Sequence, residues 1–566
     1  MRGSSNREIR TRLRRGSRSA PLAAVALTLP CTALAASTDD DANCNALGNG
    51  QRIGNAVIVS AAHVADGSAR DPNGASFKDL GGYCRVVAVA STEPRSNILI
   101  EVWLPDRARW NGKFLGTGNG GFAGSISVGA LAGGLRRGFA VANTDMGTFP
   151  AGQQGGSGQI GYAAGNGRRA AVRDWGYRAT HEMTLLAKAV IARFYGAKAK
   201  SSLFAGCSTG GHQALTEAQR FPDDYDGIIA GAPGHNRTHL HTMFLMQAMV
   251  MNRPGFVLPS LKSLTLWTDH WRAKCVGKDG GAPGDLFLTD PSLCKASPRE
   301  LVCKAGDTSA SCIPERELAQ LETIYAATRN PRTGAVIYPR INIGAEQSMV
   351  RYASLMAGFK PRGVPAEIAR WAFPPTWNPA TFDFDRDVDR VDQALAADIN
   401  ANNPNLTRFA ARGGKLIMWH GWEDYLVSPY DSIIYYDRAF ASGTDKGDFL
   451  RLFLAPGVDH CGAGAGPDSF GQMASIESFQ RNGGPASHDM LSALEAWVDA
   501  GKAPDSIMAA KYSATNPDKP VAQRPLCPYP LAARYVGTGS ASEATSFSCQ
   551  VAPTPVFERP SDIYLK

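Results

Sequence analysis

The sequence predicts an α/β fold, with a mainly parallel sheet and a large inserted domain. Short apolar runs alternate with segments of helical spacing between about residues 84 and 235, which is typical of parallel sheets covered by helices. The alternation stops between about 236 and 405 and then resumes. With 566 residues, 44% of them hydrophobic, the chain is long enough for a large core and an insertion.

Strands and helices follow one another through the first part of this core. The residues from 174 to 196 have apolar side chains at helical spacing and end at Gly196, a common residue after a helix. A second helix is expected at 212–221. Apolar runs that lead into loops or turns indicate the strands: 85–92, 97–105, 113–121, 138–147, 202–211 and 225–234.

The segment from 236 to 405 is rich in Trp, Pro, Asn and Met and holds four cysteines at short spacings. We expect it to be a lid domain inserted into the core. After it, strands are expected at 415–421 and 449–457, and helices at 429–442 and 488–504. The core is therefore expected in two parts, 37–235 and 406–566.

Residues 1–36 are typical of a signal peptide. They contain seven arginines, an apolar run from Leu22 to Leu34 and the sequence Ala33-Leu34-Ala35, which fits a cleavage site. The apolar run is shorter than the roughly 18 residues that a membrane span needs, and no later stretch is long enough either. The sequence thus predicts a secreted or periplasmic protein.

The formal net charge of +8 gives little indication of a partner. The first 36 residues contain seven arginines and one acidic residue, Glu8, and so contribute +6. The rest of the chain therefore carries only +2. Because that remainder has no basic run, nucleic acid is excluded as a partner. The sequence does not determine the oligomeric state.

Ten of the eleven cysteines lie beyond the signal peptide, and the eleventh is Cys31. An even number behind a secretory signal indicates disulfides in an oxidising compartment. The alternative, a structural zinc site, is disfavoured because the chain has no C-x-x-C pair.

The segment "SSLFAGCSTGGHQAL" predicts a nucleophilic serine. Gly206-Cys207-Ser208-Thr209-Gly210 fits the G-x-S-x-G turn between a strand and a helix. The alternative is a glycine-rich loop with an incidental serine. The strand before and the helix after favour a nucleophile elbow and hence an α/β-hydrolase core with Ser208 as nucleophile.

Such a core should supply an acid and then a histidine, each after a later strand. Asp424 follows the strand expected at 415–421, and His460 follows the next one. Asp424 is preferred over Glu423, which is expected to face solvent. It is also preferred over Asp459, which adjoins His460 and could hardly fold back to the imidazole.

Two backbone N–H groups should stabilise the oxyanion. Thr209 follows the nucleophile and supplies one, and the loop "GTGNGGFAG" is the expected source of the other, from Gly120 or Gly121. A dinucleotide site in this loop is disfavoured because no acidic partner follows about 20 residues later.

Cysteines adjoin the nucleophile and the base. Cys207 precedes Ser208 and Cys461 follows His460. If Ser208 and His460 touch, these cysteines come close enough for a disulfide, which needs Cα atoms about 4.4–6.8 Å apart. The alternative is that the two belong to unrelated disulfides.

These motifs resemble the tannase and feruloyl esterase family of α/β hydrolases. The resemblance rests on "GNGGFAG", "GCSTGG", "HGWEDYLVSP", "PGVDHCGAGAGPDSF", "LEAWVDAGKAPDSI" and "RPLCPYPLAARYVGTG", and covers nearly the whole mature chain. It implies a catalytic triad of Ser208, Asp424 and His460. It also implies five disulfides: Cys207–Cys461, Cys44–Cys84, Cys275–Cys294, Cys303–Cys312 and Cys527–Cys549.

The resemblance further implies a structural calcium site in the lid and no organic cofactor. The matching segment is "CVGKDGGAPGDLFLTDPSLC", in which Asp279, Gly281, Asp285 and Phe287 occupy the ligand positions. Val276 stands where the family usually has an aspartate. Because calcium takes six to eight oxygen ligands, the missing carboxylate weakens the expected site.

The expected function is that of a secreted serine carboxylesterase acting on feruloyl or other hydroxycinnamoyl esters. His420, Trp371 and Phe373 are expected to contact the small-molecule aromatic substrate. Within the family, the alternatives are a tannase that hydrolyses gallate esters and a mono(hydroxyethyl) terephthalate hydrolase. Alternatives of another class are a non-catalytic binding protein and a metallohydrolase that uses His420, Asp424, Asp459 and His460.

Overall fold

The computed structural model describes residues 35–72, 74–122, 124–148, 169–307, 311–346, 348, 364–442, 449–473, 483–513 and 515–565. The predicted signal peptide lies outside these residues, except for Ala35 and Ala36 at the start of helix α1 (Ala35–Ala46). Within the described ranges, no helix is both long enough and apolar enough to cross a membrane.

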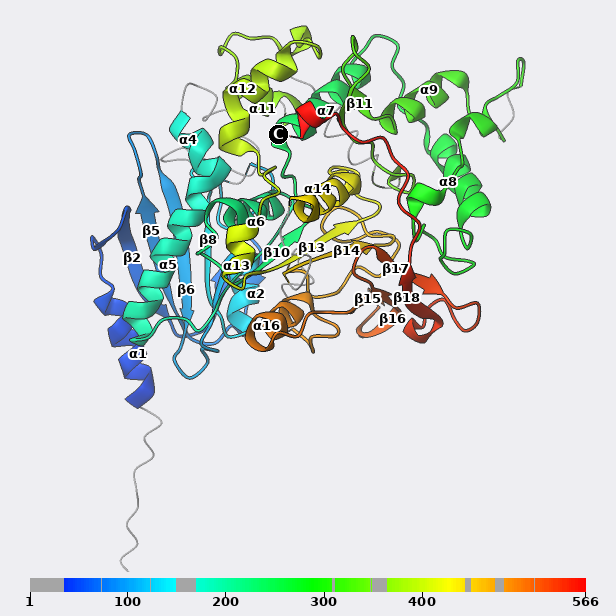
Figure 1. The fold of residues 1–566 in the computed structure, drawn as a ribbon. Helices are drawn as coiled ribbons and strands as arrows, with labels where there is room; N and C mark the ends of the chain where they lie inside the picture. Colours follow the sequence, from blue (N-terminus) through cyan, green and yellow to red (C-terminus); the bar gives the residue numbers. More distant parts are fainter. Residues whose placement is uncertain are drawn as a thin grey trace, which may run out of the picture.

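A ten-stranded sheet forms the centre of the described structure (Figure 1). The strand order is β1-β2-β5-β6-β8-β7-β9-β10-β13-β14. From β8 to β14 the neighbouring strands are parallel, whereas from β1 to β8 they are antiparallel. The strands are β1 Arg52–Ile53, β2 Ala56–Val64, β5 Tyr83–Ala90, β6 Ile98–Pro105, β7 Phe114–Thr117, β8 Ala140–Thr144, β9 Ser202–Cys207, β10 Gly227–Gly231, β13 Lys415–Gly421 and β14 Leu450–Ala455.

Helices cover both faces of the parallel half. Along β10, Ile228 and Ala230 pack into one hydrophobic cluster, while Ile229 between them packs into another. The first cluster includes residues of α5 (Ala179–Tyr195), α6 (Thr209–Arg220) and α14 (Pro429–Ala441), and the second those of α2 (Val128–Arg136) and α16 (Met490–Ala500). Side chains alternate between the two faces of a strand, and both faces are covered here. Every residue of β9 and β10 is therefore buried.

The segment inserted between β10 and β13 contains most of the remaining helices. In Figure 1 it lies mainly at the top and right of the molecule, with α13 lower, near α6. Its helices are α7 Arg237–Met251, α8 Leu261–Cys275, α9 Glu315–Ile324, α11 Glu367–Trp371, α12 Asp387–Ile399 and α13 Thr407–Ala411. Most buried apolar residues from Leu240 to Ala345 form a third cluster together with Tyr425 and Val427. Those from Ala366 to Phe409 mostly join the main core. The buried residues of the inserted segment are thus divided between these two hydrophobic clusters.

The C-terminal region adds two hairpins that the sequence analysis did not predict. Strands β15 (Ile507–Ser513) and β16 (Asn516–Leu526) form one, and β17 (Leu531–Tyr535) and β18 (Phe547–Val551) form the other.

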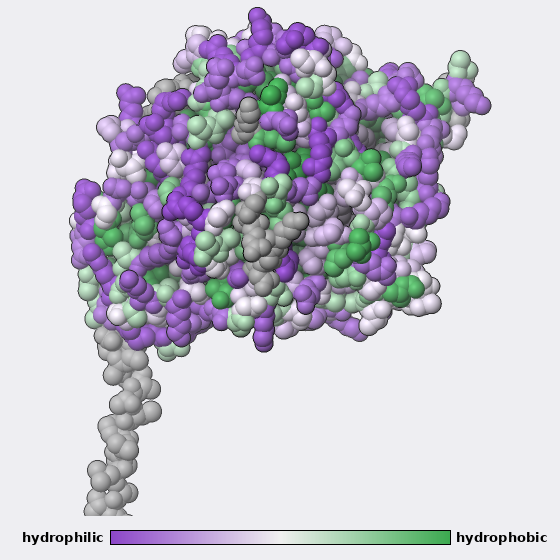
Figure 2. All heavy atoms as spheres, viewed as in Figure 1, coloured by the Kyte–Doolittle hydropathy of each residue, from purple (hydrophilic) through white to green (hydrophobic). Residues whose placement is uncertain are grey.

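The space-filling view shows mostly hydrophilic residues with separate apolar areas on this face of the molecule (Figure 2). The large apolar side chains instead fill the buried clusters.

Candidate active site

The predicted nucleophile lies at a sharp turn between β9 and α6. Ser208 has φ 64° and ψ −117°, a conformation that side chains rarely adopt. Its N–H donates to the Gly231 carbonyl at 3.0 Å, which anchors the turn on β10. A Cβ atom at Gly206 would lie 2.7 Å from the backbone of Gly210. Only glycine fits there, as a nucleophile elbow requires.

Asp424 and His460 lie beyond the carboxyl ends of β13 and β14 and contact each other. His460 donates from Nδ1 to Asp424 Oδ2 at 2.7 Å. This bond leaves Nε2 of His460 as the nitrogen that can accept a proton. Burial acts to lower the pKa of His460, but the Asp424 carboxylate outweighs it and raises that pKa above 6.5.

The Asp424 carboxylate is fully buried and has a complete set of donors. Its Oδ1 accepts the N–H groups of Leu426 at 2.8 Å and Val427 at 2.9 Å. Burial acts to raise its pKa, but the charge of His460 and the hydrogen bonds from His420 and His460 hold that pKa well below the usual value. The carboxylate is thus ionised and fixed in orientation.

The structure corrects the expected role of His420. Its side chain is fully buried, and Nε2 donates to Asp424 Oδ2 at 3.1 Å and to the Val427 carbonyl at 3.0 Å. Its Nδ1 accepts the hydroxyl of Ser432 at 2.8 Å. Because both nitrogens are engaged within the protein, His420 positions Asp424 and does not contact substrate. In the sequence, the spacing of four residues between His420 and Asp424 already indicated that the two side chains lie near each other.

The other two acids considered for the triad do not face the imidazole. Asp459 Oδ1 accepts the backbone N–H of His460 at 2.6 Å, and Oδ2 accepts from Ser348. Burial raises the pKa of Asp459 to about 6. Glu423 is buried rather than exposed as expected, and burial, reinforced by the charges of Glu346 and Asp459, raises its pKa well above 4.5.

The hydrogen bonds that Asp424 accepts also disfavour the metallohydrolase alternative. The four residues it would use are His420, Asp424, Asp459 and His460, and Asp424 already accepts four hydrogen bonds. Among the described residues, the group of His and acidic side chains close enough to hold a metal is instead His181, Glu217 and Asp224. That group does not include the residues predicted for the reaction.

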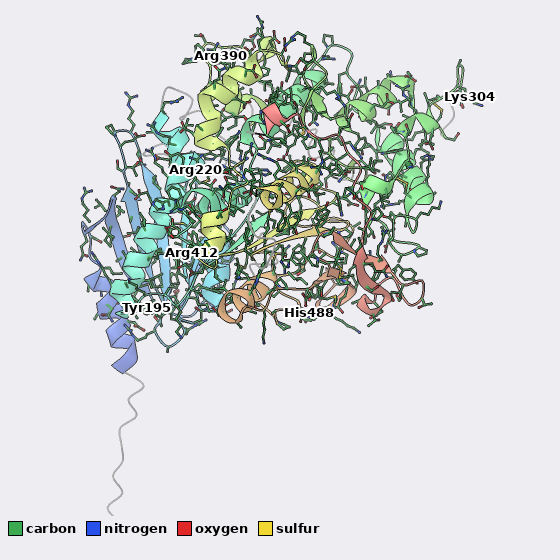
Figure 3. All side chains as sticks on the ribbon, viewed as in Figure 1. Tyr195, Arg220, Lys304, Arg390, Arg412 and His488 are labelled. Atoms are coloured by element: carbon green, nitrogen blue, oxygen red, sulfur yellow. A yellow bond between two sulfur atoms is a disulfide. The ribbon has the colours of Figure 1, made fainter. Side chains whose placement is uncertain are left out.

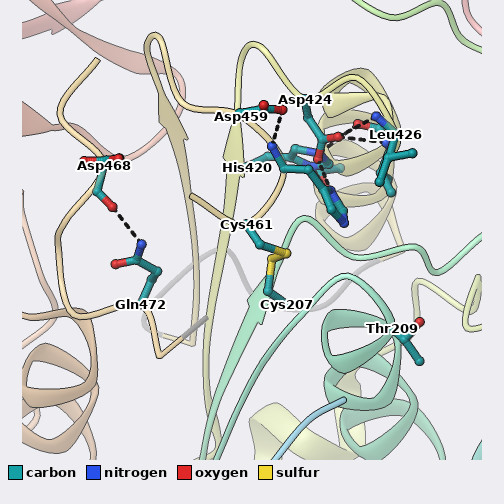
Figure 4. The surroundings of a disulfide bond; sticks show 12 residues. Cys207, Thr209, His420, Asp424, Leu426, Asp459, Cys461, Asp468 and Gln472 are labelled. Atoms are coloured by element: carbon teal, nitrogen blue, oxygen red, sulfur yellow. Dashed lines mark hydrogen bonds and ion pairs between the residues drawn. A yellow bond between two sulfur atoms is a disulfide. The ribbon is translucent and has the colours of Figure 1, made fainter. Parts of the chain in front are cut away.

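A disulfide joins the chain segments that carry the nucleophile and the base. Cys207 and Cys461 are bonded, with Cα atoms 5.8 Å apart and a separation of 254 positions in sequence (Figure 4). Ser208 and His460 adjoin these cysteines, so the bridge fixes the two loops relative to each other. The other four implied pairs are also bonded in the structure: Cys44–Cys84, Cys275–Cys294, Cys303–Cys312 and Cys527–Cys549.

Removing this bridge should weaken both activity and stability. For the variant Cys207→Ala/Cys461→Ala we expect kcat to fall about 10- to 100-fold, because small displacements of reacting groups are costly. Loss of so long a closed loop should reduce the free energy of unfolding by up to about 5 kcal/mol. The matched control Cys303→Ala/Cys312→Ala removes a bridge within the inserted segment and should keep kcat. Equal kcat in both variants would contradict the clamping role.

The residues predicted for the oxyanion hole lie close together. The Thr209 side chain is fully buried, and its hydroxyl donates to the Gly121 carbonyl at 2.5 Å. A Cβ atom at Gly118 would lie 2.5 Å from Cα of Gly210, so the glycine loop lies directly against the start of α6. Gly120 and Gly121 are therefore adjacent to the turn that carries Ser208.

The two predicted substrate-binding aromatic residues have different surroundings. The Trp371 ring lies 5.3 Å from Trp175 and 5.9 Å from Phe122, which belongs to the glycine loop. Phe373 stacks on Trp377 at 4.3 Å, and the Arg390 guanidinium lies 4.3 Å from its ring centre. Figure 3 shows Arg390 at the top of the inserted segment. Trp377 and Arg390 thus already pack on the Phe373 ring, which does not support the predicted contact between this ring and a substrate.

The residues of the predicted calcium site do not fit a calcium ion. Asp285 accepts both guanidinium nitrogens of Arg524, at 2.9 and 3.0 Å. Asp279 accepts three backbone N–H groups, and its carbonyl accepts from Arg534 at 2.6 Å. Carbonyl oxygens of Gly281 and Phe287 alone would not replace the carboxylates that calcium prefers.

Calcium should therefore leave the thermal stability of this protein unchanged. We expect equal Tm values in millimolar calcium and in excess chelator. By contrast, Arg524→Ala should lower the free energy of unfolding by about 3 kcal/mol, because it leaves the buried Asp285 carboxylate unpaired. A calcium-dependent rise of Tm that a chelator reverses would contradict this reading of the loop.

Comparison with known proteins places the chain among esterases. A model of the family described as tannase and feruloyl esterase matches residues 84–361 and 371–550. An uncharacterized esterase of Xanthomonas campestris pv. campestris is 35% identical over 534 residues, which cover 88% of this chain and 89% of that protein. Feruloyl esterase B of Aspergillus niger is 31% identical over 543 residues, which cover 93% of this chain and 99% of that protein.

The fold is also similar to a solved structure. The crystal structure of feruloyl esterase B from Aspergillus oryzae matches with a TM-score of 0.80 and 27% identity, over 90% of this chain and 100% of that one. The inserted segment and the sheet are therefore arranged as in an esterase of known structure.

Proposed function

The chain belongs to the tannase and feruloyl esterase family of carboxylic ester hydrolases, and we propose that it cleaves esters of phenolic acids through an acyl-enzyme on Ser208. The observation that carries this proposal is the hydrogen bond of 2.7 Å between His460 and Asp424. It lies next to the disulfide that joins the segments of Ser208 and His460. Ser208, His460 and Asp424 together are the nucleophile, base and acid that a serine esterase requires.

The proposed reaction begins with proton transfer from Ser208 to His460. Nε2 of His460 accepts the hydroxyl proton while Oγ of Ser208 attacks the ester carbonyl. The charge that forms on the carbonyl oxygen is stabilised by the N–H of Thr209 and that of Gly121 or Gly120. His460 then protonates the leaving alcohol. Water, activated by the same imidazole, finally releases the acid from Ser208.

Feruloyl and other hydroxycinnamoyl esters are the proposed substrates. The support is the similarity to two proteins named feruloyl esterase B. Gallate esters and terephthalate half-esters are the alternatives within the family. Trp371 is the aromatic residue proposed to contact the acyl group, because it lies beside Phe122 at the end of the glycine loop. We further propose that the protein works outside the cytoplasm, which five disulfides support.

The test is a comparison of rates on purified mature protein. Methyl ferulate, methyl gallate and mono(hydroxyethyl) terephthalate are assayed in parallel by chromatography of the released acid. We expect the highest kcat/KM on methyl ferulate. A higher value on either of the other esters would reassign the substrate within the family. No turnover of any of the three, with Ser208 still reactive toward a phosphonate, would exclude the whole substrate list.

The pH dependence should follow the protonation of His460. The imidazole must be neutral to accept the proton of Ser208, so kcat/KM should fall about tenfold per pH unit below its pKa. That pKa lies above 6.5, because the carboxylates of Asp424 and Asp459 outweigh burial and the charge of Arg237. As the pH is lowered, the loss of activity should therefore begin above pH 6.5. A pH–rate profile that stays flat down to pH 5 would contradict this assignment.

A further inference from the structure

Arg237, the first residue of α7, is a buried cation without an acidic partner among the described residues. Only 5% of the residue is exposed, and its Nε has no hydrogen-bond partner in the described structure. Burial lowers its pKa to about 9, so the guanidinium is still charged at neutral pH. Since a buried charge without a counter-charge costs several kcal/mol, its position needs an explanation.

The guanidinium contacts the predicted oxyanion hole through one side chain. Arg237 donates to the Thr209 hydroxyl at 2.7 Å, and this hydroxyl donates to the Gly121 carbonyl at 2.5 Å. The hydroxyl thus accepts from a cation and donates to the glycine loop, which fixes its orientation. A charged donor also strengthens the second bond of such a chain. Thr209 is the expected source of one oxyanion donor, and Gly121 is, with Gly120, one of the two candidates for the other.

The aromatic neighbours hold the guanidinium in place. Its carbon lies 5.0 Å from the centre of the Trp175 ring, which makes a favourable cation–π contact. Trp175 in turn packs 5.8 Å from Phe122, the residue after Gly121. The charge is therefore fixed beside the glycine loop and shielded from water. In such surroundings its field at the loop is stronger than it would be in water.

We propose that Arg237 is a positioning residue of the oxyanion hole, which fastens Thr209 to the glycine loop and stabilises the negative charge that develops on the ester oxygen. This inference rests on the proposed function, because only the serine mechanism places an anion beside Thr209. The transition-state oxyanion then supplies the negative charge that the guanidinium lacks among the described residues. Arg237 acts through Thr209 and does not touch the reacting atoms.

The test compares kcat and KM of variants on methyl ferulate, a neutral ester. Arg237→Met should lower kcat about 100-fold with little change in KM, as expected for stabilisation that acts only in the transition state. Thr209→Val removes the hydroxyl but keeps the backbone N–H, and should lower kcat in the same way. Thr209→Ser keeps a hydroxyl and should lose much less. The double variant should be little worse than either single one, because both break the same chain of contacts.

A matched control separates this role from general stability. Arg137 is also buried, but it is paired with Asp489 at 2.8 Å. Arg137→Met should lower Tm and leave kcat unchanged. Affinity for a boronic acid that mimics the tetrahedral state should fall in Arg237→Met by the same factor as kcat/KM, whereas affinity for the product ferulate should not.

The outcomes distinguish the inference from the proposed function. Wild-type kcat in folded Arg237→Met, with Ser208→Ala inactive, would overturn the inference alone. A rise in KM confined to mono(hydroxyethyl) terephthalate would also overturn it, and would make Arg237 a binder of the substrate carboxylate. Full activity of Ser208→Ala would overturn the serine mechanism itself.

Discussion

Replacing Ser208 by alanine should lower kcat by about 10⁵- to 10⁶-fold, the largest effect expected of any single change in this protein. The hydroxyl is the group proposed to form the acyl-enzyme. Ser208 follows Cys207, which is bonded to Cys461 beside His460, so the bridge holds the proposed nucleophile near the proposed base. The rate is measured as acid released from methyl ferulate, at protein concentrations high enough to detect slow turnover.

The fold of the Ser208→Ala variant should be intact. Alanine adopts the same backbone geometry as serine, and the turn is anchored by the N–H of residue 208 rather than by the hydroxyl. Ser201→Ala is the matched control, because the Ser201 hydroxyl is buried and has no partner within the described structure. It should keep wild-type kcat. A Ser208→Ala variant as active as the control would exclude the serine esterase mechanism.

Asp424→Asn should lower kcat by about 10⁴-fold without a change in side-chain size. The backbone N–H groups of Leu426 and Val427 occupy the Oδ1 position, so the amide oxygen of asparagine must face them. The amide NH2 then faces Nδ1 of His460. This forces the imidazole proton onto Nε2, the nitrogen that has to accept the proton of Ser208.

The same variant should change the pH dependence. Without the carboxylate, burial dominates and the pKa of His460 should fall, so the acid limb of the residual activity should move to lower pH. Asp459→Asn is the control, because that carboxylate accepts the backbone N–H of His460 and not its ring nitrogen. We expect it to lose less than about tenfold. Equal losses in the two variants would exclude Asp424 as the acid of the triad.

Features encoded within short stretches could be predicted from the sequence. The turn at Ser208 depends on glycines two residues away on either side, so one stretch of five residues specifies it. Helix α5 ends at Gly196 with φ 70°, where the predicted helix also ends. The strands of the parallel half are apolar at nearly every position because both of their faces are buried, and that pattern is visible without a structure.

The antiparallel half was not foreseen, since strand direction depends on which strands become neighbours. β6 and β8, separated by 34 residues, pair antiparallel, while β7 between them in sequence pairs with β8 and β9. The C-terminal hairpins were missed for a similar reason. β16 contains Pro517, Pro520 and Pro525, residues that disfavour a strand in a reading of the sequence alone.

The sequence by itself determined the α/β architecture, the order of Ser208, Asp424 and His460 along the chain, and an even set of cysteines suited to disulfides. Only the tertiary structure decided what surrounds each group. It placed His420 behind Asp424, packed Trp377 and Arg390 on Phe373, paired Asp285 with Arg524, and brought Arg237 to Thr209. The physical reason is that a motif specifies the chemistry of a residue over a few positions, whereas its partners, burial and charge come from segments up to hundreds of residues away.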